Sequence, residues 1–198
     1  MGKEYIENQT FKSENFAETA LKLGEYENCT FSNCNFLETD LSGIYFTDCV
    51  FENCDLSMSK LQGTAFREVV FKDCKLLGLR FDDCNLFGLA FRFVGCLLNF
   101  SSFFKLKIKN TRFEDCKLQE VEFVEADLTN AIFKNCDLNQ AVFEQTKLEG
   151  ADFRTAFSFS IDPELNRIKK AKFSRQNIAG LLNKYKITIC TAGRSSRA

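Results

Sequence analysis

A five-residue period runs through most of this chain and constrains its fold more than any other feature. Counting in steps of five from Phe11 meets a large apolar residue at every step to Phe91, and again from Leu98 to Phe153. A helix repeats every 3.6 residues and a strand every two, so neither element explains this spacing. The spacing fits a coil with four sides of five residues, in which each side turns one large residue inward.

Four such sides make a coil of 20 residues, so residues 20 apart should stack, like on like, as in other solenoids. The sequence therefore predicts an all-β fold: a right-handed quadrilateral parallel β-helix over residues 1–160. Because the step from Phe91 to Leu98 is seven residues, we expect a short bulge at 92–97 and no projecting loop. One side of the coil is predicted to be a ladder of Phe31, Phe51, Phe71, Phe91, Phe113, Phe133 and Phe153.

The residue two positions before each centre is also expected to point inward, where space at the corner is small. Nine of the ten cysteines occupy this position, and we interpret them as small buried hydrophobes with free thiols. Their spacings of 5, 15 and 20 and the absence of His argue against a metal site. Disulfides between coils about 4.8 Å apart stay an alternative. Six of the nine form a predicted ladder of Cys34, Cys54, Cys74, Cys96, Cys116 and Cys136.

Residues 161–190 leave the repeat and are predicted to form a C-terminal cap. Ser174 is a candidate N-cap for an α-helix at about 175–184, and 187–189 reads as a final strand. An apolar helix face on an exposed coil end would make a dimer surface. The predicted dimerisation residues are Ile178, Leu181, Leu182, Tyr185, Ile187 and Ile189. We expect the small, polar tail at 191–198 to be disordered or a cloning remnant.

The repeat unit ADFRT at 151–155 carries the A-(D/N)-(L/F)-x-x motif and resembles the pentapeptide-repeat superfamily. The end of the chain, with IDP at 161–163, AKF at 171–173, LL at 181–182 and ITI at 187–189, resembles the Qnr-type quinolone-resistance branch. That resemblance implies a rod-like homodimer that imitates duplex DNA, binds DNA gyrase and topoisomerase IV and protects them from quinolones. Loops that project from the coil are implicated in protection in that branch, and none is expected here.

Charge is unevenly distributed along the chain although the net charge is only −1. Segments 25–59 and 113–153 each carry −7, while 60–112 carries +6 and 154–198 carries +8. The acidic bands predict a partner-binding surface that imitates the phosphates of DNA. The alternative is an ordinary solvated surface on a scaffold for another protein partner, or on a rigid spacer. The predicted acidic residues are Glu38, Asp40, Asp48, Glu52, Asp55, Glu120, Glu122, Glu125, Asp127 and Asp137.

Other functions find little support in the sequence. Direct nucleic-acid binding through Lys105, Lys107, Lys109 and Arg112 is not expected, because acidic neighbours would oppose it. No His, nucleophile–base pair or Gly-rich phosphate loop is present, so we expect no enzyme activity and no cofactor. The lack of a signal peptide and of a long apolar run predicts a cytoplasmic protein that does not bind membranes. Apolar residues near the phase break should fold over the shaft or form a contact patch: Phe87, Phe93, Val94, Leu97, Phe100 and Phe104.

Overall fold

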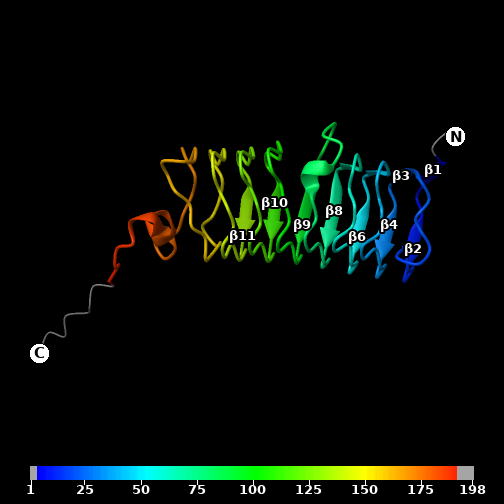
Figure 1. The fold of residues 1–198 in the computed structure, drawn as a ribbon, viewed down its shortest axis with the longest axis horizontal. Helices are drawn as coiled ribbons and strands as arrows, with labels where there is room; N and C mark the ends of the chain where they lie inside the picture. Colours follow the sequence, from blue (N-terminus) through cyan, green and yellow to red (C-terminus); the bar gives the residue numbers. More distant parts are fainter. Residues whose placement is uncertain (1–3, 191–198) are drawn as a thin grey trace, which may run out of the picture.

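The computed structural model describes residues 4–190, which wind into a rod of stacked coils with the two chain ends at opposite ends (Figure 1). Two parallel sheets run along the rod, and they confirm the predicted all-β parallel solenoid. The first sheet contains β1 (Glu4–Glu7), β3 (Gly24–Glu27), β5 (Tyr45–Thr47) and β7 (Ala65–Arg67). The second contains β2 (Thr10–Lys12), β4 (Thr30–Ser32), β6 (Val50–Glu52), β8 (Val69–Lys72), β9 (Phe91–Val94), β10 (Arg112–Glu114) and β11 (Ile132–Lys134).

The corners of the coil are made by backbone in the left-handed region. The residue two positions after an inward centre has a positive φ, as at Asn28 (52°), Asn33 (54°) and Asp48 (52°). Asn, Asp and Gly tolerate this region better than other residues, which explains why they recur at corners. Left-handed residues recur at most of these five-residue steps, where they turn the chain and give the coil its four sides.

The core of the rod consists of stacked side chains. Phe31 and Phe51 lie with ring centroids 4.7 Å apart and planes 9° apart, and rings on adjacent sides meet edge to face. The nine inward cysteines are buried and free, so the thiol interpretation holds and no disulfide joins cysteines of the described chain. The Cys54 thiol donates to the Phe31 carbonyl at 3.3 Å, which satisfies its polar atom within the core.

The predicted Phe ladder is wrong at one position, because Phe93 and not Phe91 lies in it. Phe71 pairs with Phe93, and Phe93 pairs with Phe113, in the second sheet. Phe91 lies two residues earlier in the same strand, opposite Val69, where its ring packs against Phe81 and Phe103. The two surplus residues are therefore absorbed before Phe91, and the bulge predicted at 92–97 is absent.

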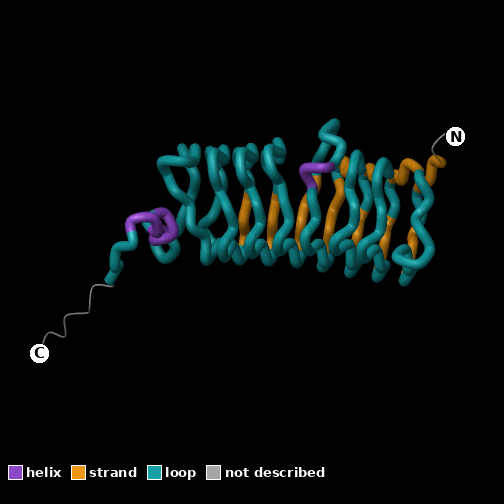
Figure 2. The backbone as a smooth tube through the Cα atoms, viewed as in Figure 1, coloured by secondary structure: helices purple, strands orange, loops and turns teal. Residues whose placement is uncertain are grey.

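A loop projects from the coil just before β9, contrary to expectation. The amide of Asn85 donates to the Thr64 carbonyl and the amide of Ala90 donates to the Phe66 carbonyl, each at 2.9 Å. The residues between these two anchors leave the wall of the rod, above the 3₁₀ turn η1 (Phe81–Asp83) (Figures 1 and 2). Leu86, which fits the five-residue period in the sequence, lies in this loop and is 65% exposed.

The C-terminal α-helix predicted at about 175–184 is also absent. The segment forms two 3₁₀ turns, η2 (Ile178–Leu181) and η3 (Asn183–Tyr185), which cover the last coil (Figure 2). The Asn177 side-chain amide donates to the carbonyls of Phe153 and Ala156, both at 2.8 Å, and holds the backbone against the coil end. Gly180 costs helix stability and lies too close to Phe159 for a side chain.

The final strand predicted at 187–189 is likewise not formed, since this segment has no strand assignment. The predicted tail at 191–198 lies outside the described residues.

Candidate partner-binding surfaces

Several residues of the two acidic bands lie at the corners of the coil. Glu38, Asp48 and Glu120 are exposed at positive-φ corner positions and have no ion pair within residues 4–190. Glu38 and Glu120 belong to the same corner row, because their amides donate to equivalent carbonyls of the next coil. Met58 and Phe100, both well exposed, occupy the same row between them. One edge of the rod therefore presents acidic charge at two levels, with apolar side chains between.

Other members of the acidic bands carry less free charge. Glu52, Asp55 and Glu125 pair with the lysine one coil away, namely Lys72, Lys75 and Lys105. Asp40 accepts from the Ser42 amide at 2.9 Å, Glu122 from the Ser102 hydroxyl at 2.8 Å and Asp137 from the Gln119 amide at 2.7 Å. These contacts leave the carboxylates negative but partly compensated.

Asp127 differs from the other nine because it is buried. Its carboxylate lies between Lys109 and Lys147 at 3.5 and 3.7 Å. Burial opposes its charge, yet hydrogen bonds from Thr129 and the two lysines keep its pKa below the ordinary value. Asp127 thus anchors a cationic surface and does not present free negative charge.

Glu114, which the sequence analysis did not single out, has the same role on the adjacent side of the coil. Its buried carboxylate contacts Arg92 at 2.8 Å and both Arg112 and Lys134 at 3.4 Å. Burial opposes ionisation, but Arg92 and Lys134 hold the pKa of Glu114 below its usual value. Three exposed cations thus share one buried carboxylate.

The projecting loop carries the most exposed aromatic side chain of the described residues, Phe87 at 78%. The Arg67 guanidinium lies 5.6 Å from the Phe87 ring centroid and 5.1 Å from that of Tyr45. Its Nε also donates to the Phe87 carbonyl at 3.4 Å. The loop is therefore held against the first sheet while its apolar tip faces solvent.

A groove of about 440 Å³ lies beside this loop. One wall is formed by the chain from Leu89 to Arg92 and the other by residues 107–112. Sequence reasoning missed both groove and loop. Because Leu86 and Phe91 both fit the five-residue period, the sequence gives no local sign that the chain leaves the coil between them. The available signal lies just after the loop, because either Phe91 or Phe93 could continue the Phe ladder. Choosing Phe93 places the two surplus residues before Phe91.

The C-terminal segment presents apolar side chains at the end of the rod. Of the predicted dimerisation residues, Ile178, Tyr185, Ile187 and Ile189 are at least half exposed. Leu181 instead packs against the core, and Leu182 is half-buried. Lys184 fastens this segment to the last coil through Asp162 at 2.8 Å and Glu164 at 2.6 Å.

Within residues 4–190, no group of three or more Cys, Asp or Glu side chains is placed to hold a metal ion. No helix of that described range is long and apolar enough to cross a membrane.

Comparison with known families assigns the repeat directly. The family model described as "Pentapeptide repeat region" matches residues 25–103, 44–123 and 106–181, so this chain belongs to the pentapeptide-repeat family. A search of curated protein sequences gives no significant match.

Among solved structures, the chain is similar to full-length QnrB1, described as a plasmid-mediated fluoroquinolone resistance protein. The identity is 16% and the TM-score 0.57, covering 93% of this chain and 100% of QnrB1. A trypsin-treated variant of QnrB1 matches at 18% identity and TM-score 0.54, covering 95% of this chain and 92% of that one. At these identities the similarity establishes the shared fold.

Proposed function

We propose that this protein is a non-enzymatic DNA mimic that binds a type II topoisomerase, DNA gyrase or topoisomerase IV, and protects it from quinolones. The observation that supports this most is the corner row in which Glu38 and Glu120 present unpaired charge at two levels of a rigid rod. Negative charge fixed at separate levels of a rod attracts a surface built to hold duplex DNA. The shared fold with QnrB1 and the presence of a projecting loop are consistent with this proposal.

The proposal includes a homodimer formed through the C-terminal segment and a cytoplasmic location. Exposed Ile178, Ile187 and Ile189 at one end of the rod would be covered by a second copy. Two rods joined at that end would place four acidic bands along one extended particle.

A supercoiling assay with purified gyrase, with and without ciprofloxacin, tests the proposal. We expect the protein to change supercoiling activity and to restore activity in the presence of the drug. The double variant Glu38→Lys/Glu120→Lys should lose the effect. The control variant Glu14→Lys/Glu18→Lys makes the same charge change outside the bands and should retain it. No effect of the unmodified protein at micromolar concentration would refute topoisomerase binding.

A second candidate function is a scaffold for another protein partner, or a rigid spacer. The partly compensated carboxylates of the acidic bands favour it, because Glu52, Asp55 and Glu125 each pair with a lysine. Under this reading both double variants behave like the unmodified protein in the gyrase assay.

A further inference from the structure

One residue in the wall of the rod has no backbone hydrogen-bond partner in the preceding coil within residues 4–190. In the following coil, the Asp127 amide donates to the Leu106 carbonyl at 2.8 Å, and the Asp127 carbonyl accepts from Ile108 at 3.0 Å. Lys107 occupies the equivalent place one coil earlier. Neither its amide nor its carbonyl has a backbone partner within residues 4–190. The segment that should pair with it projects as the loop, so the first sheet ends at β7 while the second continues.

The groove described above lies at this interruption. Leu89, Phe91 and Ile108 give it an apolar floor, and the open backbone edge of Lys107 forms one wall. An unpaired strand edge can accept another extended chain, because its donors and acceptors are already aligned. An apolar floor along that edge would receive alternate side chains of such a strand.

The rim of the groove carries excess positive charge. Arg92, Lys107, Lys109 and Arg112 line it, opposed by Glu68. The counter-ions of Arg92, Lys109 and Arg112 are the buried Glu114 and Asp127, each shared with at least one further cation. Lys107 is exposed and has no ion pair within the described chain.

We propose that this groove binds an extended acidic peptide segment of a protein partner as a short added strand beside Lys107. Main-chain hydrogen bonds of the peptide would pair with the amide and carbonyl of Lys107. Its apolar side chains would pack on the floor of the groove, and its carboxylates would contact the cations of the rim. A nucleic acid fits less well, because its backbone offers no alternating amide donors and carbonyl acceptors. The acidic band at 113–153 would also repel a long polyanion. This surface is opposite in sign to the proposed topoisomerase-binding surface and independent of it.

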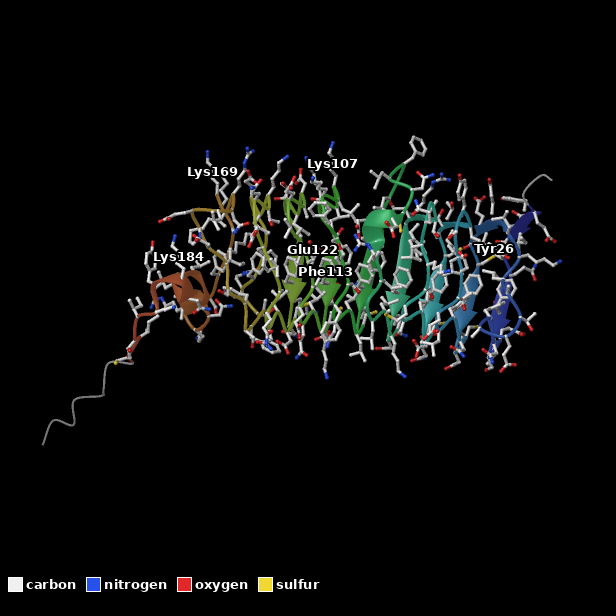
Figure 3. The ribbon with its side chains drawn as sticks, in the orientation of Figure 1. Tyr26, Lys107, Phe113, Glu122, Lys169 and Lys184 are labelled. Atoms are coloured by element: carbon white, nitrogen blue, oxygen red, sulfur yellow. The ribbon has the colours of Figure 1, made fainter. Side chains whose placement is uncertain are left out.

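Binding of a fluorescein-labelled octapeptide of alternating glutamate and valine, followed by fluorescence anisotropy at low salt, tests the proposal. We expect Lys107→Glu to weaken binding by about tenfold, since it reverses the one rim cation that has no ion pair within the described chain. Lys169→Glu is the matched control. Lys169 is also exposed and points outward on the same side of the rod as Lys107 (Figure 3), so binding should stay within about twofold.

A peptide N-methylated at alternate residues separates strand addition from simple charge attraction, and it should bind about tenfold more weakly. Thermal melts of both lysine variants establish that each is folded. The proposal is overturned by absence of binding, by equal weakening in the two lysine variants, or by undiminished binding of the methylated peptide. Tighter binding of a single-stranded oligonucleotide of eight nucleotides would also overturn it. None of these results bears on the gyrase assay, which probes Glu38 and Glu120.

Discussion

Phe71 and Phe93 stack with ring centroids 5.4 Å apart and planes 10° apart, although they lie 22 residues apart in sequence. Phe81 and Phe103 share this separation, whereas rings elsewhere in the described chain stack 20 apart, as Phe31 and Phe51 do. Phe93 stacks in turn on Phe113 at 5.2 Å and is fully buried. Phe93→Ala would leave a large cavity in the ladder, so we expect it to lower the free energy of unfolding by about 3–5 kcal/mol. Urea denaturation followed by circular dichroism measures this loss.

The matched control is Phe87→Ala in the projecting loop. Because Phe87 is largely exposed, the same truncation there should change the free energy of unfolding by no more than about 0.5 kcal/mol. Similar losses for the two variants would show that the surplus residues are not absorbed in the loop.

Thiol reactivity tests the burial of the cysteine ladder. Cys190 is exposed, whereas the other nine cysteines are buried. Burial raises the pKa of Cys49 to about 12, which further suppresses its thiolate. With a thiol reagent at neutral pH we expect one cysteine to react rapidly in the native protein and all ten after denaturation. Cys190→Ser should abolish the rapid phase, and a rapid phase that persists in this variant would contradict the buried ladder.

Stability should depend on pH through Glu114. Burial opposes its ionisation, but Arg92 and Lys134 lower its folded pKa below the ordinary 4.5. The folded state therefore gains stability from this group above pH 4.5, and loses it as pH falls through the folded pKa. At pH 7, Glu114→Gln should lower the free energy of unfolding by about 1–3 kcal/mol, because charged hydrogen bonds are lost.

Near pH 3 the difference between Glu114→Gln and the unmodified protein should shrink. Urea denaturation of both proteins at the two pH values checks this. An unchanged difference would mean that the Glu114 carboxylate does not contribute through its charge.

The repeat made most of the fold predictable from sequence, because one inward residue and one small corner residue recur in every five. This local rule places Phe31 and Cys34 in the core without any knowledge of the neighbouring coil. It fails at Leu86 and Phe91, where the local pattern is satisfied but the hydrogen bonds between coils decide which residues stay in the wall. Register between coils is a long-range property. The spacing of apolar residues constrains it only where the number of residues in each coil is unambiguous.

The candidate surfaces were predictable to a smaller extent. Acidic composition identified Glu38 and Glu120, but not that Asp127 is buried between Lys109 and Lys147, since a side chain's partners lie 18 to 20 residues away. At the C-terminus, the apolar spacing of Ile178 and Leu181 predicted an α-helix. The backbone forms 3₁₀ turns instead, because contacts with the last coil outweigh local helix preference.

The proposed dimer predicts a specific response to charge at the C-terminal end of the rod. Ile178 and Ile187 are about half exposed there, and covering them with a second copy removes apolar area from water. The double variant Ile178→Glu/Ile187→Glu would bury two carboxylates from each chain in that contact, a cost that we expect to exceed the gain from association. Light scattering should give about twice the 22.7 kDa chain mass for the unmodified protein and the single-chain mass for the variant.

The control for this experiment is Leu23→Glu, which places a charge on an exposed apolar residue near the opposite end of the rod. It should remain dimeric, because Leu23 lies in the first coils and far along the chain from the C-terminal segment. A double variant that keeps the dimer mass would exclude this end as the contact. Loss of the dimer in Leu23→Glu alone would instead move the contact to the N-terminal coils, where Ile6, Phe11 and Phe16 surround an open cavity of about 620 Å³.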